Sequence, residues 1–116
     1  MNYSYKIKKL ENKRGFFCEL EISVSRIESS EHVLYYKESD GKWVNSFQFA
    51  IDYFKHITRN PLSGYMITVV NFKTNAIDTT PVLAFFSFVK CLQNCFGVEI
   101  HDFEINFDDS SIKLFH

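Results

Sequence analysis

The segment between Gly64 and Gly97 constrains the fold of this chain more than any other part of the sequence. A run of β-branched and aromatic residues follows Gly64, which is typical of a buried strand. Thr80 then supplies a side-chain oxygen at a helix N-cap, and Pro81 suits the first helical position because its missing N–H would have no partner there. Gly97 suits the residue just after a helix C-terminus. The sequence therefore predicts a strand, a polar turn over 73–78 and a long helix.

The predicted helix is apolar over most of its surface. Because such a helix must bury most of its circumference, the other elements have to lie over it. The strand and the helix are thus expected to form the centre of the core. The polar residues of the helix form one narrow stripe: Ser87, Lys90, Gln93 and Asn94.

Three strands are predicted before this segment. Apolar and polar residues alternate from Tyr3 to Lys8 and over Phe16–Val24. A third strand is predicted over His32–Lys37, with Val33 and Tyr35 on one face and Leu34 and Tyr36 on the other. A polar turn over Glu11–Gly15 joins the first two strands, with its glycine free to adopt a positive φ. The short connections indicate an antiparallel succession.

An amphipathic helix is predicted next, with Asn45 or Ser46 as its cap and Thr58 near its end. After the second helix, alternation over Val98–Phe107 predicts another strand, and Ile112–Phe115 is either a short final strand or a loose tail. The expected fold is one α+β domain over residues 1–116. It is a two-layer sandwich with two helices on one face of a mostly antiparallel sheet, in the order βββαβα plus a C-terminal strand.

Composition and charge narrow the classes of function. The net charge is −1, so the chain as a whole lacks an electrostatic footprint for nucleic acid, and no DNA partner is expected. Residues 1–14 are basic and residues 99–116 are acidic. No apolar run suits a secretory signal or a membrane span. Three cysteines without a close spacing pattern fit a reducing compartment, so a cytoplasmic location is expected.

A zinc site is the first chemical candidate, because Cys91 and Cys95 lie four residues apart on the predicted helix and Cys18 and His101 offer two further ligands. However, zinc ligands usually come in closely spaced pairs from turns. In an almost wholly apolar helix, free cysteine behaves as a small hydrophobic residue. We therefore assign the cysteines to the core and expect no metal and no cofactor.

Asp78 beside Thr79 and Thr80 has the residue types of an activated hydroxyl, but the position at a helix start favours capping. The four histidines share no spacing, and the C-terminal carboxylates lack the calcium-loop pattern. The glycines are isolated and form no phosphate-binding loop. The sequence defines no catalytic set, and the chain is not expected to be an enzyme.

Aromatic residues make up 17% of the chain, which is high. Some of them either form a recognition surface or pack the sheet and an edge-strand dimer contact. The candidates are Tyr3, Tyr5, Tyr35, Tyr36, Trp43, Phe49 and Tyr53.

The order of elements from Trp43 to Gly97 resembles domain IV of elongation factor G and of ribosomal-protection-type translation factors. With the preceding strands, the resemblance covers roughly residues 3–100. The chain departs from the family in its first loop, which keeps only Gly15, and at Asn75, where the family usually has histidine. The family's helix, glycine, strand, Asp-Ser-Ser cap and second helix correspond here to Ser46–Thr58, Gly64, Tyr65–Phe72, Asp78-Thr79-Thr80 and Val82–Phe96.

The resemblance implies a fold like that of ribosomal protein S5 domain 2, with a left-handed β-α-β crossover. It also implies that the loops Glu11–Gly15 and Lys73–Asp78 lie together at one tip, which in the translation factors reaches the ribosomal decoding centre. The matching tip of this chain offers four side chains suited to phosphate contacts: Lys13, Arg14, Lys73 and Asn75.

Two functions are therefore expected from different classes. The first is a small, non-enzymatic binding domain that acts through a protein partner, either another protein or a second copy of the chain. The alternative is a ribosome- or RNA-associated, translation-related factor that uses the basic loop tip. Phosphate binding weakens steeply with ionic strength, whereas an apolar protein contact does not.

Overall fold

The computed structural model describes residues 1–11, 13–36, 42–101, 103–107 and 111–113, the last three by backbone alone. The end of the strand predicted over His32–Lys37 and the C-terminal residues 114–115 of the strand or tail predicted over Ile112–Phe115 therefore lie outside the described residues. In chain order the elements are β1 (Asn2–Glu11), β2 (Arg14–Arg26), β3 (Val33–Tyr36), α1 (Val44–Thr58), β4 (Tyr65–Lys73), α2 (Pro81–Phe96), β5 (Glu104–Asn106) and β6 (Ser111–Lys113).

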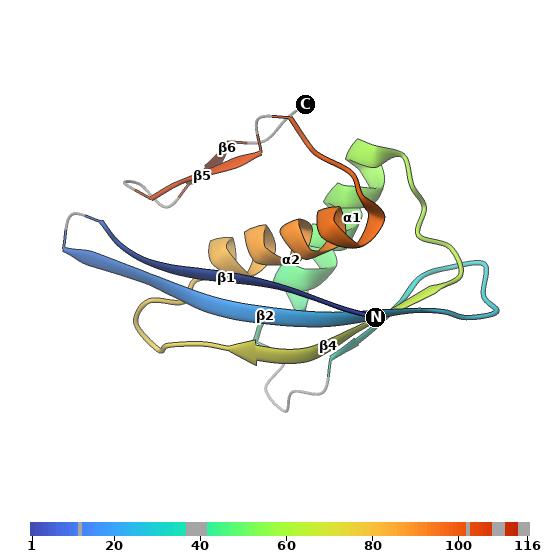
Figure 1. The fold of residues 1–116 in the computed structure, drawn as a ribbon, viewed down its shortest axis with the longest axis horizontal. Helices are drawn as coiled ribbons and strands as arrows, with labels where there is room; N and C mark the ends of the chain where they lie inside the picture. The colour runs from blue at the N-terminus through green and yellow to red at the C-terminus, as the bar shows by residue number, and fades with distance from the viewer. Residues whose placement is uncertain (12, 37–41, 102, 108–110, 114–116) are drawn as a thin grey trace.

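The fold is an α+β two-layer sandwich. One layer is a four-stranded sheet in the order β1-β2-β4-β3, and both helices cover the same face of it (Figure 1). The β1–β2 and β2–β4 pairs are antiparallel, whereas β3 and β4 are parallel. The predicted fold class and element order are confirmed, and the sheet is mixed.

Strand β3 does not pair with β2, the strand that precedes it in the chain. It runs opposite to β2, as expected, but β4 lies between them and pairs with both. A parallel β3–β4 pair needs a long crossover connection, and α1 provides it. The short connection over residues 27–32 correctly predicted that β3 runs opposite to β2. It did not predict which strands lie next to each other in the sheet.

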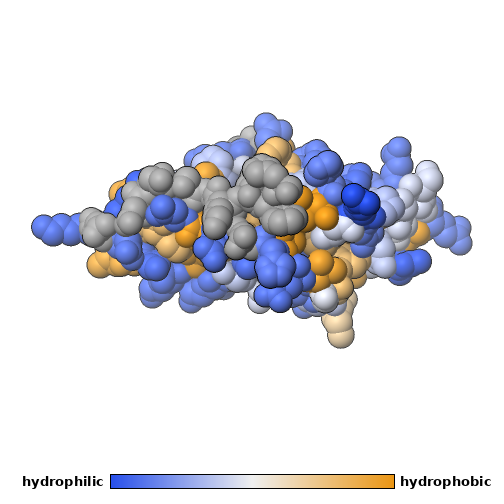
Figure 2. All heavy atoms as spheres, turned by 90° about the horizontal axis from the view of Figure 1, so that it is seen from above, coloured by the Kyte–Doolittle hydropathy of each residue, from blue (hydrophilic) through white to orange (hydrophobic). Residues whose placement is uncertain are grey.

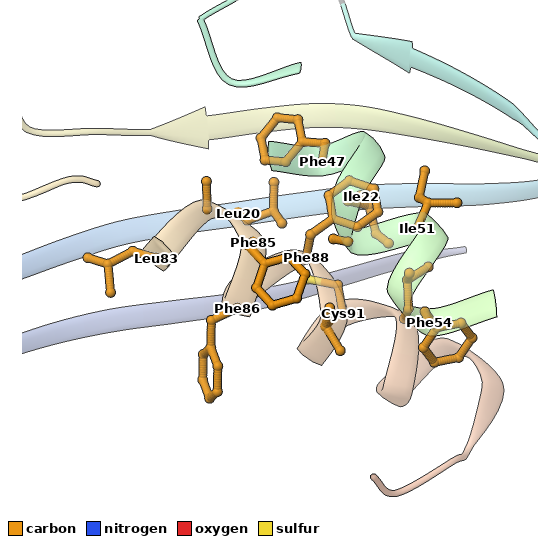
Figure 3. Close-up of a cluster of buried hydrophobic side chains, with 14 of the residues drawn as sticks. Leu20, Ile22, Phe47, Ile51, Phe54, Leu83, Phe85, Phe86, Phe88 and Cys91 are labelled. Carbon is orange, nitrogen blue, oxygen red and sulfur yellow. The ribbon is translucent and has the colours of Figure 1, made fainter. Parts of the chain in front are cut away.

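The core lies between the sheet and the helices. Phe47 of α1 packs against Phe88 of α2, with ring centroids 5.1 Å apart, and against Phe72 of β4 at 5.2 Å. Figure 3 shows Phe47 and Phe88 facing Leu20 and Ile22 of β2, and these four side chains are fully buried. The strand alternation that predicted the inward face of β2 is confirmed from Phe16 to Ile22.

Helix α2 is covered on a third side by the segment that follows it. Phe103 stacks on Phe86 at 4.8 Å and contacts Tyr53 of α1 at 5.6 Å. The predicted polar stripe is only partly exposed: Ser87 and Gln93 are buried, Lys90 is partly buried and Asn94 is exposed. Ser87 has no exposed surface, and its Oγ lies 3.0 Å from Cys18 Sγ in the core.

The two helices begin differently. Thr80 caps α2 as predicted, accepting a hydrogen bond from the Leu83 N–H, and Gly97 ends it in the left-handed conformation. The prediction that Asn45 or Ser46 caps α1 was wrong. That helix starts at Val44 after Trp43, which makes no side-chain cap bond but is buried against Phe72 with ring centroids 5.5 Å apart. Packing rather than capping fixes this helix start.

Replacing Thr80 by Ala should lower the free energy of unfolding by about 1 kcal/mol, because the Leu83 N–H loses its acceptor. Urea unfolding followed by circular dichroism measures the change. Thr74→Ala is the matched control, since Thr74 is exposed and starts no helix. Equal losses in the two variants would contradict the capping role.

The C-terminal part differs from the prediction. Of the strand expected over Val98–Phe107, only β5 forms, and it pairs with β6 in a separate two-stranded sheet (Figure 1). Ile100 and Phe103 are used instead to cover α2 and are buried. Because this segment does not join the main sheet, β1 remains an edge strand of that sheet. Within the described residues, neither helix has both the length and the apolar character needed to cross a membrane.

Candidate binding site at the loop tip

The β1–β2 turn and the β4–α2 loop are in direct contact, as the resemblance implied. The Phe17 N–H donates to the Asp78 carbonyl at 3.2 Å. The Thr79 hydroxyl donates to the Phe17 carbonyl at 2.6 Å and accepts from the Asn75 N–H at 2.8 Å. We call residues 8–11, 13–17 and 73–79 the tip. Two hydrogen bonds to backbone groups of Phe17 thus tie the two loops into one surface, and the bond between Asn75 and Thr79 holds the second loop itself.

Gly15 is required for close approach rather than for its conformational freedom. A Cβ at this position would lie 2.7 Å from Oδ2 of Asp78, closer than ordinary contact allows. The expected positive φ falls on Lys13 instead, at 65°. The glycine therefore allows the Asp78 side chain to lie against the β2 backbone.

Asn75 has a structural role in its loop. Its Oδ1 accepts from the Ile77 N–H at 2.9 Å, and its carbonyl accepts from the Thr79 N–H at 3.1 Å. This is the turn-forming use of an asparagine side chain. The side chain is still exposed, but its acceptor oxygen is engaged within the loop.

The predicted cations lie at the tip, and two more join them. Lys13, Arg14 and Lys73 are all exposed. Arg14 lies over the Phe16 ring at 5.3 Å, and Lys73 Nζ is 3.5 Å from Glu19. Sequence reasoning missed the other two, Lys8 and Lys9, although strand alternation puts Lys8 on the outer face beside the turn.

A groove of about 510 Å³ runs between the two loops. Its floor is the start of β2, and its walls come from the end of β1 and from the β4–α2 loop. It is lined by Lys8, Lys9, Leu10, Gly15, Phe16, Phe17, Asn75 and Asp78.

Two aliphatic side chains beside this groove are strongly exposed. Leu10 is 74% exposed and lines the groove, and Ile77, next to Asp78, is 88% exposed. Figure 2 shows hydrophilic residues where the β1–β2 hairpin projects, with hydrophobic areas between them. Sequence reasoning missed both residues. For Ile77 the available signal was a large apolar residue inside the otherwise polar turn over 73–78, whereas Leu10 lies near the end of β1.

The cysteines have the properties of core residues. Cys18 and Cys91 are fully buried, and Cys95 is half-buried. Burial raises the pKa of the Cys91 thiol to about 12 and also raises that of Cys18. Both groups are held as neutral thiols, which are poor nucleophiles and poor metal ligands. His101 is exposed, and no cluster of three metal-ligating side chains occurs among the described residues.

The raised pKa of Cys91 makes the stability depend on pH. In the unfolded chain this thiol ionises near 9.0, whereas in the folded chain it ionises near 12. The folded state therefore holds its proton more tightly, and the free energy of unfolding should fall between about pH 9 and 12. Urea unfolding across this window should show a smaller fall for Cys91→Ala. An unchanged slope would contradict the assignment.

Most of the candidate aromatic residues pack against the core. Trp43 is buried, and four tyrosines are partly buried against the core: Tyr3, Tyr5, Tyr36 and Tyr53. Only Tyr35 and Phe49 of the set are largely exposed, at 52% and 58%. They lie on β3 and α1, on different layers. The set therefore does not form one aromatic surface.

The Asp78–Thr80 segment also follows its structural interpretation. The hydroxyl of Thr79 bonds to backbone groups of the tip, and the hydroxyl of Thr80 caps α2. Neither is arranged as a nucleophile with Asp78. The tip thus presents exposed cations and aliphatic side chains around a groove that hydrogen bonds hold in place.

Comparison with known proteins gives a likeness in fold alone. No protein-family model and no curated protein matches the sequence. A solved protein of Thermus thermophilus superposes with a TM-score of 0.57 at 15% sequence identity. The match covers 80% of this chain and 16% of that protein, so this chain corresponds to a small part of its length.

Proposed function

We propose that the chain is a small, non-enzymatic binding domain, resembling domain IV of elongation factor G in an S5 domain 2-like fold, and that it acts in the cytoplasm through a protein partner. The observation that carries the proposal is the tip, where hydrogen bonds to the backbone hold two loops around a groove flanked by Leu10 and Ile77. Exposed aliphatic side chains beside a fixed groove favour a partner that covers them.

The properties of the candidate reactive groups support a binding role. The raised pKa values of the Cys18 and Cys91 thiols work against nucleophilic use. The hydroxyls of Thr79 and Thr80 are engaged by the backbone. A catalytic site requires a nucleophile or base in hydrogen-bond contact with the group that orients it.

The association should be tested with native cell extract treated with nuclease. Tagged protein is incubated with the extract at about 50 mM and about 200 mM salt, and retained proteins are identified by mass spectrometry. One protein should be retained under both conditions and should then bind saturably as a purified component. Retention that disappears after nuclease treatment, or the absence of any saturable partner, would overturn the proposal.

The second candidate is a ribosome- or RNA-associated factor, favoured by the gathering of Lys13, Arg14 and Lys73 at the tip. Its phosphate contacts predict a steep loss of affinity with salt. Lys13→Glu combined with Lys73→Glu should abolish cosedimentation with ribosomes if this function is correct. Unchanged cosedimentation of the double variant, or none with the wild type, would exclude it.

A further inference from the structure

We propose that the tip groove binds an acidic segment of the partner protein, and that this segment also carries aliphatic side chains. The inference rests on the proposed function, since it names the chemistry of the partner at the same site. Its physical basis is a groove of about 510 Å³ whose lining includes Lys8, Lys9 and the exposed Leu10.

The groove exists before any partner arrives. The Asp78 side chain packs against Gly15, its carbonyl accepts from the Phe17 N–H, and Thr79 ties the other loop to the same strand. An Asx turn at Asn75 fixes the intervening residues. Since these groups are already ordered, little conformational entropy is lost on this side when a segment binds.

The charge of the tip favours an acidic segment. Within the described part of the chain, Lys8 and Lys13 form no ion pair. Lys9 pairs with Glu11 at 3.6 Å, but both side chains are exposed, so the pair is weak and open to exchange. Asp78 is the acidic side chain in the groove lining, against Lys8 and Lys9. Carboxylates of an incoming segment would therefore meet an excess of positive charge.

The exposed aliphatic side chains of the tip favour a segment that also carries aliphatic side chains. Leu10, which lines the groove with Lys8 and Lys9, is 74% exposed, and Ile77, which precedes Asp78 in the chain, is 88% exposed. Covering such a side chain contributes about 1.5–3 kcal/mol in favourable cases. A segment with only carboxylates would leave this surface in water, so the groove fits a segment that alternates acidic and aliphatic side chains.

The same features favour protein over RNA at the groove. Single-stranded RNA is usually held by stacking its bases on exposed aromatic rings. The aromatic rings in the described tip are Phe16, which is 2% exposed, and Phe17, which is half-buried. The exposed aliphatic side chains offer phosphates no donor, whereas they can pack against aliphatic side chains of a peptide.

The test uses a fluorescein-labelled synthetic peptide of about twelve residues, roughly 40 Å when extended, with a leucine at every third position and aspartate or glutamate at most others. Anisotropy is measured with the full chain. The same peptide with serine for leucine should bind about tenfold more weakly. A single-stranded RNA of similar length should bind more weakly than the leucine peptide.

Two variants and two matched controls locate the site. Lys8→Glu with Lys13→Glu should weaken binding about tenfold or more, and Leu10→Ser with Ile77→Ser by a similar factor. Arg26→Glu reverses one charge at the far end of β2, which is half of the charge change in the double variant, and Val70→Ser changes another exposed aliphatic residue, 49% exposed on β4. Both controls should change the dissociation constant by less than about twofold.

The inference is overturned if the leucine peptide does not bind, if RNA binds more tightly, or if the control variants lose as much affinity as the tip variants. These results are distinguishable from failure of the proposed function. A protein retained from nuclease-treated extract by the wild type and by both tip variants alike would keep the proposed function and reject this groove as its site.

Discussion

Replacing Phe47 by Ala should lower the free energy of unfolding by about 3–5 kcal/mol. This ring has no exposed surface and contacts three others, Tyr36 at 5.1 Å, Phe72 at 5.2 Å and Phe88 at 5.1 Å. Truncation would open a cavity where β3, β4, α1 and α2 meet, and these close-packed elements would relax only partly. Urea unfolding followed by fluorescence of Trp43 reports the change.

Phe49→Ala is the matched control, since it deletes the same atoms from the same helix two positions later. Phe49 is 58% exposed and contacts Phe85 at 5.0 Å. Its removal should lower the free energy of unfolding by about 1 kcal/mol or less. Comparable losses at both positions would mean that the core is not centred on Phe47.

Replacing Thr79 by Val should lower the free energy of unfolding by about 2 kcal/mol. Valine keeps the shape of threonine but removes two hydrogen bonds, the one donated to the Phe17 carbonyl and the one accepted from the Asn75 N–H. Thr79 is 8% exposed, so the Phe17 carbonyl would lose its partner in a largely buried place. The two loops of the tip would then separate more easily.

The loosening should be seen locally as well as in the global stability. Amide hydrogen exchange in Thr79→Val should accelerate at Phe17, Asn75 and Ile77 more than in α1. Thr74→Val serves as the control, because Thr74 is exposed and belongs to the same loop. Uniform acceleration over the chain would show that Thr79 contributes only general stability.

The sequence predicted the elements well where a local signal defines them. Alternation located β1 and β2, and Thr80, Pro81 and Gly97 located both ends of α2. The order of strands was not predictable in the same way. The insertion of β4 between β2 and β3 depends on how α1 packs back onto the sheet, and no residue pattern within β3 records that choice.

The C-terminal part shows a second limit. Alternation over Val98–Phe107 has the period of a strand, yet Ile100 and Phe103 are buried because they cover α2. A period of two in the sequence indicates which side chains are buried. It does not indicate whether they are buried against a neighbouring strand or against a helix. The need to cover a helix as apolar as α2 was evident from the sequence, but the covering segment was not.

The tip was predictable in part. The resemblance to a known fold placed its two loops together, and Gly15 beside Asp78 supports that placement through contact. The groove, the hydrogen bonds of Thr79 and the exposure of Ile77 depend on side-chain geometry across the two loops. No local pattern within either loop could have specified them.

The most direct test of the proposed binding function is site-specific photo-crosslinking in cells that naturally contain the protein. A photoreactive amino acid replaces Ile77, which is 88% exposed, or Val70 on the outer face of β4 as a control. We expect a nuclease-resistant adduct with one protein at position 77 and none at position 70. An adduct with RNA, or the same adducts at both positions, would contradict a protein-binding tip.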